Sequence, residues 1–350
     1  MIEIKSPGRI CFFGDHQDYL GLPVISGTID RYVYIKASKI ESSFFEINLL
    51  DFNESLKIEF KNDPKKIAPS DYFRAGLYVL EKNGIIPNQG YQIQINGDLP
   101  INAGLSSSSS LVVGWIKFLV KAFAVGRKID NLQIAKWAVE TEVDFFNQAG
   151  GIMDQYTISI GGLMMIDTSK KTYEKLEGSL GPLLVIDSGE SKNTQGVLSN
   201  AKVNAQEAIK HVKKSNKDFD LTKSKKSDFK KYLNEIPIKY RSYWESTILN
   251  HEITKNAIKI LTRVNSSKSK LGELMNSHQY LLKNNIKNTP IKLSKQMDEA
   301  ISAGAIGAKI VGSGGGGCMV VMVDEKNISK VKKAILSSGA KDVFKVNITN

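Results

Sequence analysis

The sequence contains little of what marks a secreted or membrane-spanning protein. Only two cysteines occur among its 350 residues, Cys11 and Cys318, and their neighbours are apolar or glycine-rich. We expect two reduced core residues and no disulfide framework. No apolar run approaches the roughly 20 residues of a membrane-spanning helix. The first residues lack the layout of a signal peptide, so the expected location is cytoplasmic.

The signatures of several enzyme classes are also missing. The histidines are few and far apart, and none belongs to an H-E-x-x-H metal motif. No C-x-x-C pair and no G-x-S-x-G elbow occurs. Zinc-protease, thiol-redox and α/β-hydrolase chemistry therefore find no support. The histidines are His16, His211, His251 and His278.

Acidic residues are outnumbered by basic ones. Lys and Arg total 48 against 36 Asp and Glu, a formal net charge of +12. A basic chain favours anionic partners such as nucleotides and phosphorylated metabolites. Many lysines fall in residues 213–231, where aromatic residues do not alternate with them as in a base-stacking surface. We interpret this segment as a solvated face and expect no nucleic-acid and no membrane partner.

Apolar spacing predicts an α+β protein of two domains, residues 1–180 and 181–350. The first half is rich in strand patterns and the second in helical ones, but the chain ends in strand, glycine turn, strand, helix and strand between residues 308 and 348. In the first half we expect helices at 71–83, at 131–147 and directly after the serine-rich segment 100–110. We expect strands at 2–13, 24–38, 44–60, 91–100, 157–167 and 182–188.

A serine-rich segment, P-I-N-A-G-L-S-S-S-S-S at residues 100–110, lies between a strand pattern and an apolar helix. A flexible linker would not continue into a helix without a gap. Small residues at a helix start expose backbone N–H groups beside the positive end of the helix dipole, which forms an anion site. No Gly-Lys-Ser/Thr follows, so it is not a Walker loop. The predicted phosphate-binding residues are Gly104, Leu105, Ser106, Ser107, Ser108, Ser109 and Ser110.

A glycine-rich segment, K-I-V-G-S-G-G-G-G-C-M-V-V at residues 309–321, contains the spacing G-x-G-x-x-G. A dinucleotide site needs a helix after this motif, and here a strand pattern follows. Two interpretations remain: a simple hairpin turn, or a backbone that packs against a phosphate loop or a substrate.

Two acidic segments could form a polar pocket. Residues 7–19, P-G-R-I-C-F-F-G-D-H-Q-D-Y, offer Asp15, His16 and Asp18 as acceptors for hydroxyl groups, or form a surface turn with capping aspartates. In G-G-I-M-D-Q-Y, Asp154 is either a helix cap or a catalytic carboxylate, and Glu142 precedes it by twelve positions.

Taken together, these segments resemble the GHMP kinase superfamily, which includes galactokinase, homoserine kinase, mevalonate kinase and phosphomevalonate kinase. The resemblance implies a ribosomal-protein-S5-like N-terminal domain, a ferredoxin-like C-terminal domain and an active site between them. The strings P-G-R, D-H-x-D-Y and G-I-M-D-Q look like galactokinase, although galactokinases usually carry Glu where this sequence has Asp15. Residues 304–323 look more like mevalonate kinase.

The resemblance also implies residue roles in transferring the γ-phosphoryl group of ATP to a sugar hydroxyl, with the anomeric one expected. Asp154 would orient or deprotonate that hydroxyl, with Arg9 beside it. Ser108 and Glu142 would hold Mg²⁺. The residues expected to contact the sugar are Asp15, His16, Asp18, Tyr19 and Gly151.

Two alternatives remain open. A mevalonate kinase is disfavoured because Asp15 and Asp18 would repel the carboxylate of mevalonate. A non-catalytic sugar sensor is disfavoured because Asp154, Glu142 and Arg9 are all present. The expected partners are therefore a sugar and a nucleotide, and the oligomeric state is left open.

Overall fold

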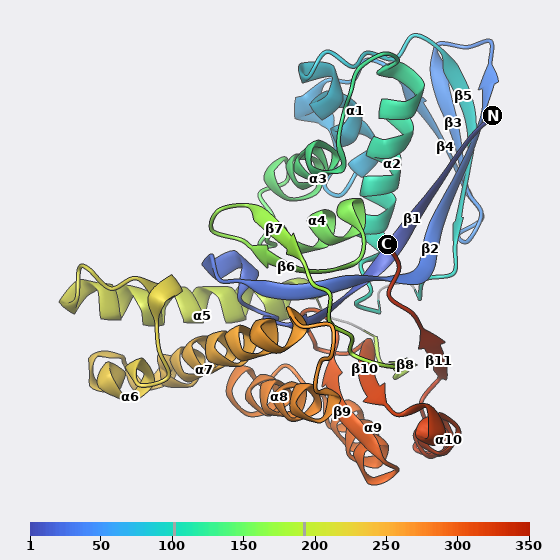
Figure 1. The fold of residues 1–350 in the computed structure, drawn as a ribbon. Helices are drawn as coiled ribbons and strands as arrows, with labels where there is room; N and C mark the ends of the chain where they lie inside the picture. The colour runs from blue at the N-terminus through green and yellow to red at the C-terminus, as the bar shows by residue number, and fades with distance from the viewer. Residues whose placement is uncertain (101–102, 192–193) are drawn as a thin grey trace.

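The computed structural model describes residues 1–100, 103–191 and 194–350. Ile101 and Asn102 of the serine-rich segment lie outside the described residues. Two sheets with their covering helices are stacked in the molecule (Figure 1). Within the described residues, no helix is both long and apolar enough to cross a membrane.

The first sheet contains seven strands in the order β4-β3-β5-β2-β6-β7, with β1 paired antiparallel to β2. Its two longest strands follow apolar, β-branched sequence and match the predicted positions closely. The strands are β1 (Ile2–Phe13), β2 (Val24–Ile40), β3 (Phe44–Leu49), β4 (Glu54–Glu59), β5 (Gly90–Gly97), β6 (Leu163–Asp167) and β7 (Thr172–Lys175).

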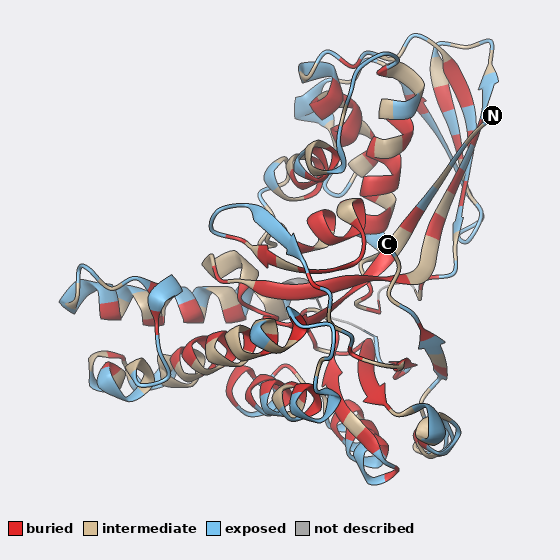
Figure 2. Cartoon of the chain, viewed as in Figure 1, coloured by how far each residue is buried: buried red, intermediate tan, exposed pale blue. Residues whose placement is uncertain are grey.

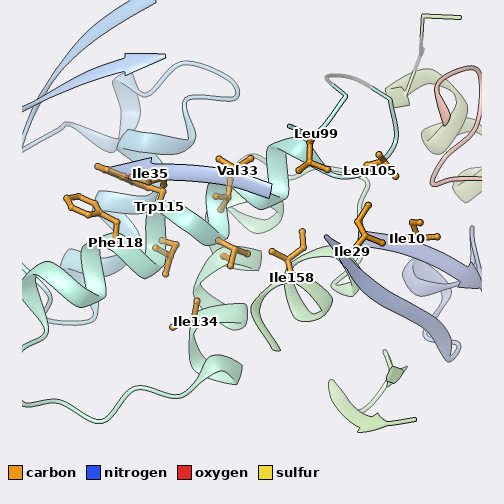
Figure 3. Close-up of a cluster of buried hydrophobic side chains, with 14 of the residues drawn as sticks. Ile10, Ile29, Val33, Ile35, Leu99, Leu105, Trp115, Phe118, Ile134 and Ile158 are labelled. Carbon is orange, nitrogen blue, oxygen red and sulfur yellow. The ribbon is translucent and has the colours of Figure 1, made fainter. Parts of the chain in front are cut away.

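Helices cover one face of this sheet (Figure 1). They are α1 (Tyr72–Lys82), α2 (Ser107–Phe123), α3 (Asn131–Val139) and α4 (Met153–Ile160). Trp115 and Phe118 of α2 are fully buried in one core with Val33 and Ile35 of β2 (Figure 3). Leu105, at the start of the serine-rich loop, belongs to the same core, which anchors the loop to the sheet.

The strand prediction for 157–167 is wrong in its first part. Residues 157–160 belong to α4, and β6 begins only at Leu163. The β-branched run T-I-S-I favours a strand locally, but packing of Tyr156 and Ile158 into the core overrides that preference. The helix predicted at 131–147 is α3 followed by a π-helical segment, Glu140–Asp144.

The second sheet contains β8 (Leu183–Asp187), β9 (Ala305–Ile310), β10 (Cys318–Val323) and β11 (Asp342–Val346) in the order β11-β8-β10-β9. All three pairings are antiparallel. With helices between β8 and β9 and between β10 and β11, this is the βαββαβ arrangement of a ferredoxin-like domain. The predicted fold class is confirmed.

The second sheet is buried on both faces. Leu183 and Val185 of β8 pack in the core shared with the first sheet. Leu184 and Ile186 pack in a second core with the outer helices. The two domains therefore share one apolar core. Cys11 and Cys318 are both buried, and neither forms a disulfide within the described residues, as predicted.

The helices of the second half are α5 (Thr194–Ser215), α6 (Asp228–Lys231), α7 (Ile238–Leu261), α8 (Lys268–Leu281), α9 (Ile291–Ser302) and α10 (Ile328–Ser337). The pair α5 and α7, with α6 at its end, extends away from the second sheet as an arm (Figure 1). Its tip, which includes the lysine-rich segment 213–231, is largely exposed (Figure 2).

The change from the first sheet to the second falls between Lys175 and Leu183, close to the predicted boundary. The last residues return to the first sheet, however, because Asp30 N donates to Asn347 O at 3.1 Å and Ile348 bridges Ile29. The division into 1–180 and 181–350 stays a prediction.

Candidate active site

A cavity of about 920 Å³ lies where the two domains meet. The N-terminal domain lines it with β1, the loop after β1, the serine-rich loop and residues 142–155. The C-terminal domain contributes part of α5 and the glycine-rich turn at Gly312 and Ser313. The serine-rich segment, the glycine-rich segment and the two acidic segments thus meet at one cavity of ordinary ligand-binding size.

An arginine–aspartate pair lies in the cavity wall. Arg9 Nε donates to Asp154 Oδ1 at 2.7 Å and Nη2 donates to Oδ2 at 2.8 Å, a bidentate arrangement. Arg9 Nη1 donates to Gly104 O at 2.7 Å, and Ser106 Oγ donates to Asp154 Oδ2 at 2.5 Å. Arg9 therefore fixes the position of Asp154 against the serine-rich loop. The Asp154 side chain keeps 25% of its surface exposed toward the cavity, against 5% for Arg9.

The serine-rich loop has the geometry that an anion site requires. Ser106 has a left-handed backbone with φ of 60°, and α2 begins at the next residue. Ser110 Oγ donates to Pro7 O at 2.7 Å, and Leu105 is fully buried, so both residues anchor the loop. Ser107 and Ser108 line the cavity at the first turn of α2, where backbone N–H groups are free of intrahelical partners. Phosphate binding by this loop stays a prediction.

The glycine-rich turn packs directly against the serine-rich loop. Cys318 N donates to Ala103 O at 2.6 Å, and a Cβ added at Gly317 would lie 2.6 Å from the same oxygen. The φ of Gly317 is also positive, at 81°, so glycine is required here for two reasons. Of the two interpretations of this segment, the contact supports a backbone that packs against the loop.

Glu142 and Ser108 bring a carboxylate and a hydroxyl together in the cavity wall. Glu142 lies on the π-helical segment and accepts a hydrogen bond from Gln155 Nε2 at 2.7 Å. Burial raises the pKa of Glu142 to about 6, although hydrogen bonds from Gln155, Ser109 and Ser108 oppose the rise. A carboxylate and a hydroxyl are the hard donors that Mg²⁺ prefers, with substrate phosphates completing its shell. The residues present fit this ion.

Asp18 begins a short 3-10 turn, Asp18–Leu20, on the wall near Asp154. Its Oδ1 accepts from Tyr19 N at 2.9 Å. A Cβ added at Gly151 would overlap the Asp18 carboxylate, so glycine is needed there for close approach. Burial raises the pKa of Asp18 to about 6, and the neighbouring charge of Asp154 adds to the rise.

His16 connects the two domains. Its Nδ1 lies 2.9 Å from Tyr19 Oη, and its Nε2 lies 3.0 Å from both Ser313 O and Asn288 Nδ2. Ser313 follows Gly312 in the glycine-rich turn, so the ring joins the loop after β1 to that turn. A sugar contact by His16 or Tyr19 stays a prediction.

Asp15 is engaged in a buried ion pair that the sequence interpretation did not anticipate. Its Oδ2 lies 2.8 Å from Lys309 Nζ, and both side chains are almost fully buried. Burial alone would raise the pKa of Asp15, but the charge and hydrogen bond of Lys309, together with the neighbouring histidines, hold the pKa below its ordinary value. Burial lowers the pKa of nearby His278 to about 3, so this imidazole is neutral. Asp15 therefore joins the two domains. A sugar hydroxyl that contacts Asp15, as predicted, would bind a carboxylate that is already paired with Lys309.

The unpredicted residues at or beside the cavity include four polar ones that make the contacts described here: Gln155, Lys202, Asn288 and Lys309. A signal existed for two of them. Lys309 is the only charged residue in the apolar run G-A-K-I-V-G, and Gln155 directly follows Asp154. Lys202 and Asn288 come from helical and loop sequence with no local motif, so only the tertiary structure reveals them.

Comparison with known proteins agrees with this geometry. Residues 71–162 match the family of GHMP kinases N terminal domains, and residues 258–341 match the GHMP kinases C terminal family. Residues 2–39 match the galactokinase galactose-binding signature. Together the three matches cover more than half of the chain.

The chain belongs to the GHMP kinase superfamily. A galactokinase from Pyrococcus furiosus is 28% identical over 96% of this chain and 92% of its own length. A galactokinase from Clostridium perfringens is 29% identical over 94% of this chain and 87% of its own length.

Among solved structures, Lactococcus lactis galactokinase complexed with galactose superimposes with a TM-score of 0.87 at 23% identity, covering 99% of this chain and 93% of its own. The mevalonate kinase of Methanococcus jannaschii gives a TM-score of 0.74 at 23% identity, covering 100% and 98%. This GHMP kinase is a phosphotransferase that acts on a hydroxyl group, with ATP as its second substrate.

Proposed function

We propose that this GHMP kinase transfers the γ-phosphoryl group of ATP to the anomeric hydroxyl of a monosaccharide of the galactose type. The observation that carries the proposal is the Arg9–Asp154–Ser106 constellation, which lies between the serine-rich loop and the wall formed by Asp18. The galactose-binding signature over residues 2–39 supports a sugar as the acceptor.

In this proposal the triphosphate lies along the serine-rich loop. Ser107 and Ser108, at the start of α2, line the cavity there. Phosphoryl transfer depends mainly on positioning and on neutralising charge, and a helix N-terminus supplies fixed positive potential for both. Gly104 and Ser106 are hydrogen-bonded to the Arg9–Asp154 pair, and these contacts support a position of the reacting phosphate next to the pair.

Glu142 and Ser108 would hold Mg²⁺ with the phosphate oxygens of the nucleotide. The ion supplies charge neutralisation at the transferred group. Glu142 is buried, and the described residues give it no cationic partner; this fits the role, because a bound cation would offset the burial cost that raises the pKa of this carboxyl.

Asp154 would accept the proton of the attacking hydroxyl. Arg9 and Ser106 hold its two oxygens in place, and part of the carboxylate remains open to the cavity. Asp18 and Tyr19 would contact the ring hydroxyls of the sugar, and Gly151 leaves room for the Asp18 carboxylate. A cytoplasmic location, expected from the sequence, stays a prediction.

The variant Asp154→Asn tests the assignment. A general base contributes about 10²–10⁴-fold to a rate, so we expect kcat with galactose to fall by that factor while the Kd for Mg-ATP changes little. Asp144→Asn is the matched control, because Asp144 is exposed on the π-helical segment near the cavity.

ADP release is measured with galactose, with mevalonate and without acceptor. Full activity of Asp154→Asn would refute its role as base. Turnover of mevalonate but not of galactose would favour the mevalonate kinase alternative. Tight galactose binding without any ADP release would favour the sensor.

A further inference from the structure

One cation in the cavity wall has no part in the proposed reaction. Lys202 lies on α5, is half-buried and lines the same cavity as Asp18 and Gly151. Its Nζ donates to Ala149 O at 3.2 Å and lies 5.9 Å from the centre of the Tyr19 ring. Lys202 therefore adjoins the segment that packs on Asp18, at the end of the cavity where the acceptor is expected.

The neighbouring cations are neutralised, and Lys202 is not. Arg9 pairs with Asp154 at 2.7 Å and Lys309 pairs with Asp15 at 2.8 Å. For Lys202, the described part of the chain offers a backbone carbonyl and a ring, but no carboxylate within salt-bridge distance. A half-buried ammonium group with one weak acceptor is available to an anionic ligand.

We propose that Lys202 binds an anionic substituent of the acceptor, a carboxylate or phosphate on a sugar carbon remote from the reacting hydroxyl. This inference rests on the proposed sugar kinase activity and narrows the acceptor to a sugar acid or a sugar phosphate. The anion forms a charge-assisted hydrogen bond with Nζ while the ring hydroxyls face Asp18.

From the sequence, Asp15 and Asp18 would both repel an anionic acceptor. In the structure, Lys309 neutralises Asp15 in the buried ion pair. Asp18 alone then repels an anion. That repulsion disfavours an orientation of the sugar in which its anionic group lies beside Asp18. It favours the orientation in which the anionic group contacts Lys202.

Specificity is measured as a ratio of kcat/KM values for the full-length kinase with Mg-ATP. The acceptors are galacturonate, galactose 6-phosphate and galactose, so that the first two distinguish a carboxylate from a phosphate. The variant is Lys202→Met, which keeps much of the side-chain volume without the charge. Lys210→Met is the matched control, because Lys210 is exposed on the same helix and pairs with Glu207 at 3.3 Å.

We expect one anionic sugar to exceed galactose by about tenfold or more in the wild type, and Lys202→Met to reduce this ratio by about tenfold. The ratio should be unchanged in Lys210→Met. A wild type that prefers galactose would overturn the role of Lys202 but not the proposed function. Equal losses for all acceptors in Lys202→Met would have the same meaning. Absence of turnover with all three sugars in the wild type would overturn the proposed function as well.

Discussion

Replacing Glu142 by Gln should make the unliganded protein more stable at alkaline pH while impairing its activity. Glu142 is 6% exposed, and burial raises its pKa from the ordinary 4.5 to about 6. Because the folded state holds the proton more tightly than the unfolded state, ionisation costs stability as the pH rises from 4.5 through 6. Above that range the cost is constant at about 2 kcal/mol.

Gln at position 142 removes this cost and preserves the local contacts. Its side-chain oxygen can accept the hydrogen bond that Gln155 Nε2 now donates to Glu142 Oε2. We therefore expect Glu142→Gln to raise the free energy of unfolding by about 2 kcal/mol at pH 8 and to leave it unchanged at pH 4, where Glu142 is also neutral. Asp144→Asn, an exposed site on the same segment, should have little effect at either pH.

Urea unfolding followed by circular dichroism at pH 4 and pH 8, without nucleotide, measures these differences. The same variants are then unfolded with Mg-ADP. The wild type should gain stability from the ligand, and Glu142→Gln should gain much less because it lacks a metal-binding carboxylate. A Glu142→Gln protein no more stable than wild type at pH 8 would refute the argument, since it would mean that the buried charge is already compensated.

Two further substitutions probe the geometry of the site. Gly151→Ala should displace the Asp18 carboxylate, since the added Cβ would overlap it, and should raise the KM for the acceptor about tenfold with little change in the KM for ATP. An unaltered acceptor KM would show that Asp18 does not contact the sugar. Lys309→Met should leave the charge of Asp15 buried and unpaired and should destabilise the fold by about 3–5 kcal/mol in urea unfolding. Adding Asp15→Asn should recover part of that loss, and a double variant as unstable as Lys309→Met would contradict the ion-pair account.

Local sequence patterns predicted much of the fold because, in most segments, the conformation favoured by the local residues is also the one that buries their apolar side chains. The β-branched and aromatic residues in the first 40 positions form β1 and β2, and the strand–turn–strand pattern near the end forms β9 and β10. The prediction was wrong at residues 157–160, where β-branched residues lie in α4. Their burial against the first sheet decides the conformation there, and that contact is not visible in local sequence.

The candidate site was predictable where a motif carried its chemistry within a few residues. The serine-rich loop, Asp154 and the segment around Asp18 were found in this way, and the structure brings them to one cavity. Contacts between distant segments were not predictable. Asp15 and Lys309 are separated by almost 300 positions, and Lys202 enters the cavity only because α5 packs beside the loop after β1.

The most direct test of the account is to identify the product. Wild-type protein and Asp154→Asn are incubated with Mg-ATP and with galactose or galacturonate, and the products are examined by phosphorus NMR. We expect the wild type to give a sugar 1-phosphate, recognised by coupling of its phosphorus to the anomeric proton, and Asp154→Asn to give almost none. Phosphate on another carbon would contradict the assigned acceptor hydroxyl, and equal product from both proteins would contradict the central role of Asp154.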